Sequence, residues 1–265
     1  MSTTDKTRYV IVGMARSGTT ATHNAVFGHP NVCAMADEFR VDPFFTKGVA
    51  CFTVGGNNKW ERRINYNALF DAVTKYPAGR PDPDGKRLIA YNGTPSVPKQ
   101  ENLAHGLKVA IPSAEDAKSL VDSLQEFFPE MRIIHVRRAD WVAQFASLMR
   151  AQDTGVWHTR DEKPAVAQEG EKMRLPPQAF SKYLEMATEV EQQLRRLHDS
   201  HAVCEFSYEQ DLLPNVPCKA HRLFEFLDLR AMDPTWMRLT KTAPPLEDFV
   251  ENVQELREMM TAHCS

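Results

Sequence analysis

Residues 9–20 read YVIVGMARSGTT, and this stretch decides the fold. An apolar strand runs to Gly13, a short loop turns, and a helix is predicted to begin near Ser17. That helix runs toward Gly28 and Pro30, where it must end. The chain therefore opens with a β-strand that leads directly into an α-helix.

Outward from this unit, strands and helices alternate along the chain. Four further short segments read as strands, several of them almost continuously apolar: residues 31–35, 107–111, 132–136 and 202–206. Apolar residues at helical spacing predict helices over 113–128, 178–198 and 246–260, the first of them capped by Ser113 with Asp116. Such runs suit a parallel sheet that is buried on both faces. The sequence predicts an α/β fold, a P-loop-NTPase-like parallel sheet of about five strands flanked by helices.

Two regions do not follow this alternation. Residues 40–104 carry Gly-Gly-Asn-Asn at 55–58 and Pro-Asp-Pro-Asp-Gly at 81–85, and residues 153–178 are polar and end in two prolines. Long insertions of this kind commonly serve as lids or substrate loops. We expect a single domain over residues 1–265. Both insertions are expected to be acceptor-side loops, that is, loops on the side where a substrate that accepts a transferred group would bind.

The composition is that of a globular protein. Of the 265 residues, 42% are hydrophobic and 25% are charged, and the formal net charge is -3. These values exclude disordered, collagen-like and disulfide-scaffold classes, and they predict neither a nucleic-acid partner nor an anionic membrane partner. No apolar run is long enough for a membrane-spanning helix. The five cysteines, an odd number without a CxxC pair, favour reduced thiols in the cytoplasm.

The turn after the first strand has the residues of an anion site. The first turn of a helix carries free backbone N–H groups and the positive end of the helix dipole. Gly18 lets the backbone approach an anion closely, Arg16 adds a fixed positive charge, and Ser17, Thr19 and Thr20 add hydroxyl donors. The pattern predicts a site for a phosphate or sulfate group, with an ordinary strand-to-helix turn capped by Ser17 as the alternative.

The same turn differs from the Walker A motif of nucleotide triphosphatases. That motif ends in Gly-Lys-Ser/Thr, whereas no lysine occurs here between residues 7 and 46. A site without this lysine is poorly equipped for the γ-phosphate of ATP. Two functions that such an anion site would also allow stay open as alternatives: a P-loop-type small-molecule kinase and a non-catalytic nucleotide-binding protein.

A second group of basic and hydroxyl residues follows the fourth predicted strand. Arg137 and Arg138 come at its carboxyl end, where open α/β sheets bind ligands, and Ser147 lies on the next helix. An arginine forms a two-pronged charged contact with phosphate, and a hydroxyl adds a further hydrogen bond. We expect a second phosphate site here, with Arg138 preferred over Arg137; a solvated arginine pair is the alternative.

These segments carry a family resemblance. Residues 16–20 resemble the 5′-phosphosulfate loop of sulfotransferases that use 3′-phosphoadenosine 5′-phosphosulfate (PAPS), and residues 135–147 resemble their 3′-phosphate segment. Residues 148–157 resemble the bacterial trehalose-sulfotransferase branch, and residues 207–212 and 246–252 resemble bacterial nodulation-type sulfotransferases. The resemblance implies a PAPS-dependent sulfotransferase with adenosine 3′,5′-bisphosphate as the nucleotide product.

The reaction that the resemblance implies needs no metal. The sulfuryl group would pass in line from PAPS to a hydroxyl of a carbohydrate, a glycolipid or a small metabolite. Positioning and charge stabilisation dominate such a transfer, and Arg16, the loop N–H groups and a nearby lysine supply the positive charge. The identity of the acceptor stays open, and so does the oligomeric state, for which a homodimer is one option.

Further roles fall on residues outside the two segments. The acceptor hydroxyl needs a base, and the candidate is Glu38, which follows the second strand and matches the catalytic glutamate of trehalose-type relatives; Asp37 competes for the role. Lys108, inside an apolar strand, is predicted to contact the sulfuryl group or the acceptor, with a salt-bridged or strand-end lysine as the alternative. Tyr208 is predicted to face the adenine, with a tyrosine of the core as the alternative, and Lys241 is predicted to reach the 3′-phosphate.

Histidines and cysteines around the fifth predicted strand have a spacing that superficially resembles that of metal ligands. The set is His198, His201, Cys204, Cys218 and His221. Because the first two lie where a helix ends and Cys204 falls inside a strand, these side chains would meet only by chance. The sequence therefore predicts no metal site.

Overall fold

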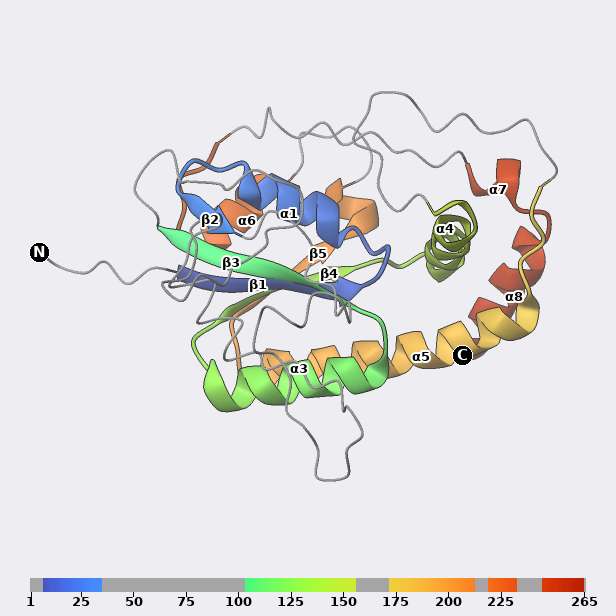
Figure 1. Cartoon of the computed structure of the whole chain (residues 1–265), viewed down its shortest axis with the longest axis horizontal. Helices are drawn as coiled ribbons and strands as arrows, with labels where there is room; N and C mark the ends of the chain where they lie inside the picture. Colours follow the sequence, from blue (N-terminus) through green and yellow to red (C-terminus); the bar gives the residue numbers. More distant parts are fainter. Residues whose placement is uncertain (1–6, 35–102, 156–171, 213–218, 233–244, 265) are drawn as a thin grey trace, which may run out of the picture.

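The computed structural model of the chain describes residues 7–34, 103–155, 172–212, 219–232 and 245–264 (Figure 1). Its centre is one sheet with the strand order β2-β3-β1-β4-β5, in which every strand pair is parallel. The strands are β1 (Thr7–Met14), β2 (Val32–Ala34), β3 (Ala104–Ile111), β4 (Arg132–Arg137) and β5 (Val203–Ser207). The predicted α/β class with a parallel sheet flanked by helices is confirmed.

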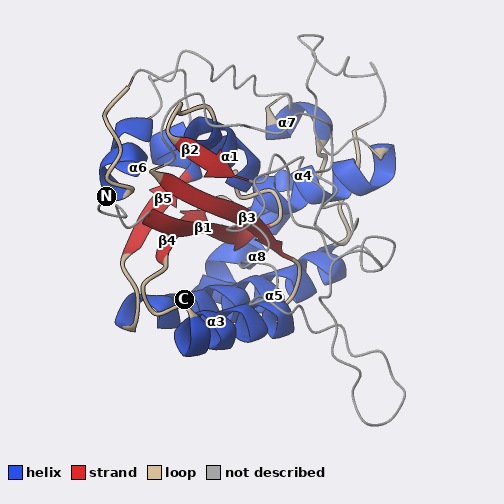
Figure 2. Ribbon diagram, turned by 60° about the vertical axis from the view of Figure 1, so that its left-hand side comes forward, coloured by secondary structure: helices blue, strands red, loops and turns tan. Residues whose placement is uncertain are grey.

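Helices cover both faces of this sheet, so the strands lie in the middle layer of three (Figure 2). On one face lie α1 (Thr19–Phe27) and α6 (Ala220–Phe226), and on the other lie α3 (Ala114–Phe127) and α5 (Pro177–Arg195). Side chains of β1 alternate between two cores: Tyr9 and Ile11 pack on the α1 face, whereas Val10 and Val12 pack on the α5 face. This two-sided burial explains why the strand reads as a continuous apolar run.

The start of α3 has the cap that the sequence predicts. The Ser113 side chain accepts a hydrogen bond from the backbone N–H of Asp116 at 3.1 Å. Glu115 and Asp116 place negative charge in the first turn, where it interacts favourably with the helix dipole. The helix then buries Leu120 and Leu124 against the sheet side of the core.

The C-terminal helical region differs from the expectation. The spacing predicts one helix over 246–260, but the structure has α7 (Leu246–Phe249) and α8 (Val253–Cys264), separated by an extended Val250. Met173 forms a parallel bridge with Val250: its N–H donates to the Phe249 carbonyl at 2.8 Å, and its carbonyl accepts from the Glu251 N–H at 3.0 Å. A distant segment therefore provides backbone hydrogen bonds that replace those of a continuous helix.

The remaining helices complete the edge of the sheet where the strands end. Helix α4 (Trp141–Thr154) follows β4, and α8 packs against both α4 and α5 (Figure 1). Within the described ranges, no helix is both long enough and apolar enough to cross a membrane. Most of the first predicted insertion, residues 40–102, and part of the second, residues 156–171, lie outside the described residues. The single-domain organisation, the acceptor-side role of these loops and the cytoplasmic compartment stay predictions.

Candidate functional site

The loop between β1 and α1 has an unusual backbone that leaves the start of the helix open. Arg16 has a φ of 66° and Gly18 a φ of 101°, both in the left-handed region. Gly18 is the N-cap of α1 without a side-chain cap bond, and the first turn contains no acidic residue. The first-turn N–H groups therefore have neither a side-chain cap nor an acidic side chain within their own turn, as in an anion site.

Gly18 is also required by its neighbours. A Cβ atom at this position would lie 2.7 Å from Leu212 Cδ1 and 2.8 Å from Tyr208 Cδ2. Real carbon contacts are longer, so the glycine allows the ring of Tyr208 to pack directly on the loop. The loop is consequently held between the strand that it leaves and the turn that follows β5.

The hydroxyl groups of the loop have distinct surroundings. Ser17 is 1% exposed, and its Oγ has no hydrogen-bond partner among the described residues. A buried hydroxyl without a partner is costly unless a ligand satisfies it, so Ser17 is suited to donate to an anion. Thr19 is buried beside it, and Thr20 Oγ1 accepts a hydrogen bond from Lys108 Nζ at 2.8 Å.

Lys108 brings a positive charge into the interior behind this turn. It lies on β3 and is 1% exposed, and its contact with Thr20 places the ammonium group beside the first turn of α1. The charge adds to the positive potential of the helix start. The structure thus joins Lys108 to the first turn of α1. Its contact with the transferred group or the acceptor stays a prediction.

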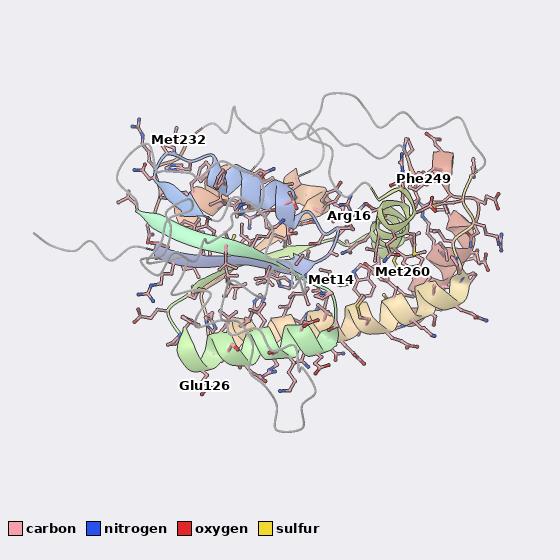
Figure 3. The ribbon with its side chains drawn as sticks, in the orientation of Figure 1. Met14, Arg16, Glu126, Met232, Phe249 and Met260 are labelled. Atoms are coloured by element: carbon pink, nitrogen blue, oxygen red, sulfur yellow. The ribbon has the colours of Figure 1, made fainter. Side chains whose placement is uncertain are left out.

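The two predicted phosphate-binding segments meet in space. Arg16 Nε donates a hydrogen bond to Ser147 Oγ at 3.0 Å, and Arg138 Nη1 donates to the Arg16 carbonyl at 3.2 Å. Figure 3 shows Arg16 where β1 ends, between α1 and α4. Gln144, which the sequence reasoning missed, ties α4 to the same loop because its Nε2 donates to the Ala15 carbonyl at 2.9 Å.

Arg137 and Arg138 lie in different environments. The guanidinium carbon of Arg138 is 4.4 Å from the centre of the Tyr208 ring, and its Nε is 4.0 Å from Glu209 Oε1. Arg137 instead turns to the other face of the sheet, where its Nε donates to Glu191 Oε2 at 2.9 Å. Of this pair, Arg138 contacts the loop and Arg137 contacts Glu191. The preference for Arg138 at the 3′-phosphate stays a prediction.

A short helical turn after β5 supports the arginine side of the site. This turn, η3 (Tyr208–Leu212), supplies the Tyr208 ring and the Glu209 carboxylate. Glu209 accepts hydrogen bonds from the backbone N–H groups of Ala139 at 3.1 Å and Asp140 at 3.2 Å, at the start of α4. Sequence reasoning missed Glu209, although it lies in the segment 207–212 that carries part of the family resemblance.

Tyr183 is more deeply buried than Tyr208 and lies on α5. It packs among Phe145 and Phe180, and its hydroxyl has no hydrogen-bond partner among the described residues. Burial raises the pKa of Tyr183 far above its usual range, although the charge of Arg138 acts in the opposite direction. The phenol therefore stays protonated at neutral pH.

Several predicted site residues lie outside the described residues or outside the site. Glu38, Asp37, Lys241 and Cys218 belong to the first group. The predicted His/Cys spacing does not form a cluster among the described residues: His201 Nε2 contacts the Phe128 carbonyl at 3.0 Å, Cys204 Sγ contacts the Glu205 carbonyl at 3.9 Å, and His221 is exposed on α6. His198 faces Glu205 instead.

Comparisons with known proteins bear on the family of the chain. A solved structure of a sulfotransferase from Alicyclobacillus acidocaldarius matches 97% of this chain and 92% of its own, with 15% identity and a TM-score of 0.46. A search of curated proteins gives no match. The sequence model of the sulfotransferase family matches residues 9–234, which include the loop, the arginine pair and the turn after β5. The branch within the family stays a prediction, but the chain itself belongs to the sulfotransferase family.

Proposed function

We propose that the chain transfers the sulfuryl group of PAPS to a hydroxyl of a carbohydrate, a glycolipid or a small metabolite, and releases adenosine 3′,5′-bisphosphate. The observation that carries the proposal is the hydrogen bond from Arg16 to Ser147, with Arg138 bound to the same loop. A nucleotide with phosphate groups on both the 3′ and the 5′ position of its ribose can bind two such adjoining anion sites at once.

The 5′ end of the nucleotide is proposed to bind at the loop. The first-turn N–H groups of α1, the unsatisfied Ser17 hydroxyl and Thr19 would donate to phosphate oxygens. Arg16 and Lys108 would stabilise the negative charge that grows on the bridging oxygen as its bond to sulfur breaks. Binding energy at this loop would therefore increase toward the transition state, as catalysis requires.

The 3′-phosphate is proposed to bind Arg138 and Ser147. Ser147 Oγ accepts from Arg16 in this structure and can donate its own proton to a phosphate oxygen. The Tyr208 ring packs against Gly18 and Arg138. These contacts support the proposal that the ring lies beside the adenine. The positively charged side chain of Lys241 is proposed to contact the same phosphate.

Glu38 is proposed as the base on the acceptor side. As the acceptor oxygen bonds to sulfur, its proton would pass to the Glu38 carboxylate, and the electron pair of the broken bond would stay on the departing phosphate. The transfer needs no metal in this scheme, because the loop, Arg16 and Lys108 supply the positive charge. Glu38→Gln should abolish turnover while the affinity for adenosine 3′,5′-bisphosphate stays close to that of the wild type.

A ligand comparison tests the proposal. Thermal unfolding of the chain is measured with adenosine 3′,5′-bisphosphate, ADP and ATP at equal concentrations. A ligand that binds only the folded state stabilises it more the lower its Kd, by about 2.7 kcal/mol at 100 times the Kd. Because the proposal makes the bisphosphate the tightest of the three ligands, it should give the largest rise in Tm. A larger rise with ATP would contradict the proposal and favour a kinase. Release of the bisphosphate from PAPS on addition of candidate acceptors then identifies the acceptor class.

A further inference from the structure

A second polar cluster lies on the α5 face of the sheet, away from the anion site. His135 of β4, His198 of the short helix η2 (Arg196–Asp199) and Glu205 of β5 each offer one ligand atom, and these atoms all lie within 4.8 Å of one another. We propose that these three side chains bind a divalent transition-metal ion, with Zn²⁺ as the best match. The ion would join three separate elements of the fold through three protein ligands and keep a fourth position for water.

The first argument is the state of His135. The residue is 1% exposed, and neither ring nitrogen has a hydrogen-bond partner among the described residues. Its Nε2 is 3.6 Å from Glu191 Oε1, which is too long for a hydrogen bond. Buried polar groups in folded proteins are almost always satisfied. A protonated His135 would pair with Glu191, whereas a neutral one can bind a further ligand. A metal ion is the ligand for which neutral imidazole is best suited.

The second argument is the charge of the cluster. Two carboxylates flank Arg137, since Glu191 Oε2 is 2.9 Å from its Nε and Glu205 Oε2 is 3.6 Å from its Nη1. The other oxygen of each carboxylate points to a histidine: Glu191 Oε1 to His135 and Glu205 Oε1 to His198. With neutral imidazoles, two negative charges oppose one positive charge. The remaining negative charge favours a cation between the rings and Glu205.

The third argument is geometry. Zinc bound at roughly 2.0–2.2 Å in a tetrahedron places its ligand atoms about 3.4 Å from each other. His198 Nε2 and Glu205 Oε1 are already 3.5 Å apart. The His135 and His198 rings meet edge to face with centroids at 6.2 Å. The third ligand atom lies within 4.8 Å of these two and would have to move closer to bind the same ion. Two imidazoles with one carboxylate form a ligand set that occurs at zinc sites. The partly exposed side chains of His198 and Glu205 leave the site open to solvent.

Metal binding by the whole chain tests this proposal. Metal-free protein is titrated with Zn²⁺, and Co²⁺ is used as a spectroscopic substitute whose visible absorption reports tetrahedral coordination. We expect a site that is lost or weakened at least about tenfold in His198→Ala and in Glu205→Gln. Zn²⁺ should also raise the Tm of the wild type but not that of either variant, because an ion that binds only the folded state stabilises it.

His221→Ala is the matched control, because it removes an exposed histidine from α6 outside the cluster. This variant should keep the metal stoichiometry, the Co²⁺ spectrum and the Zn²⁺-dependent rise in Tm of the wild type. Equal zinc binding by the wild type, His198→Ala and Glu205→Gln would overturn the proposal. So would the absence of zinc binding at millimolar concentration, since a proton on one histidine would then balance the charge. Neither result bears on the nucleotide, which binds elsewhere in the proposed function.

Discussion

Arg137 and Arg138 are neighbours on the chain, yet they belong to regions with opposite electrostatics. Arg138 joins a group in which Arg16 and Lys108 add positive charge and Glu209, 4.0 Å from Arg138, is the nearby carboxylate. Arg137 lies between two carboxylates on the other face of the sheet. Counted over the described residues alone, the first region has more positive than negative side chains, whereas the second has more negative ones.

The alternation of side chains along a strand explains the difference. Successive residues of β4 point to opposite faces, so a step of one residue moves a side chain from one helix layer to the other. His135 and Arg137 therefore share the α5 face with Glu191. Arg138 follows the strand and turns to the loop and Tyr208. Two arginines in sequence thus lie in separate surroundings, and we propose ligand binding for Arg138 and a structural role for Arg137.

The largest expected effect on nucleotide affinity comes from replacing Arg138 with alanine, and the same replacement of Arg137 serves as the comparison. Arg138→Ala should weaken the affinity for adenosine 3′,5′-bisphosphate on the order of 100-fold, because a charged contact to phosphate in a largely buried site is lost. Arg137→Ala is the matched control and should change this affinity by less than about threefold. Isothermal titration calorimetry measures both.

For the free energy of unfolding, Arg137→Ala should have the larger effect of the two variants. Arg137→Ala leaves the buried Glu191 carboxylate without its closest cation and should lower the free energy of unfolding by about 2 kcal/mol. Arg138→Ala should lower it less. Urea denaturation of both variants provides the numbers. Equal losses of affinity in the two variants would show that the assignment of tasks to the arginines is wrong.

The second prediction concerns the loop that receives Arg138. In Gly18→Ala, the new methyl group would meet Tyr208 and Leu212 in a backbone conformation that alanine rarely adopts. We expect a loss of about 2–3 kcal/mol in unfolding free energy, from strain and overpacking together. Gly155→Ala is the control, since Gly155 also has a positive φ but no atom of the described residues lies within 4 Å of the place that a methyl group would take. It should lose only about 1 kcal/mol, and thermal unfolding compares the two.

The sequence predicts those parts of the molecule whose signals are local. The strand and helix of residues 9–27 follow from an apolar run, a loop and a stop signal that lie next to each other. The cap of α3 follows in the same way from Ser113 and Asp116, three residues apart. Each of these features depends on interactions within a few residues, so the order of residues is enough to reveal it.

Other features depend on partners that are distant in sequence. The break between α7 and α8 requires the backbone of Met173, and the start of α4 uses the Glu209 carboxylate from another strand end. The choice between Arg137 and Arg138 depends on which face each residue meets, and a strand that is apolar on both faces gives no pattern to decide this. His135 is likewise hidden inside an apolar strand, with its neighbour Glu191 on α5.

The third prediction addresses the acidic region around Arg137. Burial raises the pKa of Glu191, but His135 and Arg137 more than offset this and leave the pKa below its ordinary value, so the carboxylate is charged at neutral pH. Glu191→Gln removes that charge and should cost about 1–2 kcal/mol of unfolding free energy in metal-free buffer. Glu189→Gln, an exposed change on the same helix, should cost less than about 0.5 kcal/mol. The affinity for the nucleotide should stay unchanged in both variants, which calorimetry checks.

The smallest effect should come from Ser147, and it distinguishes a phosphate contact from a structural one. Ser147→Ala removes the hydroxyl that Arg16 reaches, and a single hydrogen bond to a charged group is worth about 1.5 kcal/mol. The affinity for adenosine 3′,5′-bisphosphate should fall about tenfold, whereas the affinity for ADP, which has no 3′-phosphate, should fall less than twofold. An equal loss for both ligands would mean that Ser147 acts by holding Arg16 in place. The ratio of the two affinities therefore reports whether the hydroxyl recognises the 3′ end of the nucleotide.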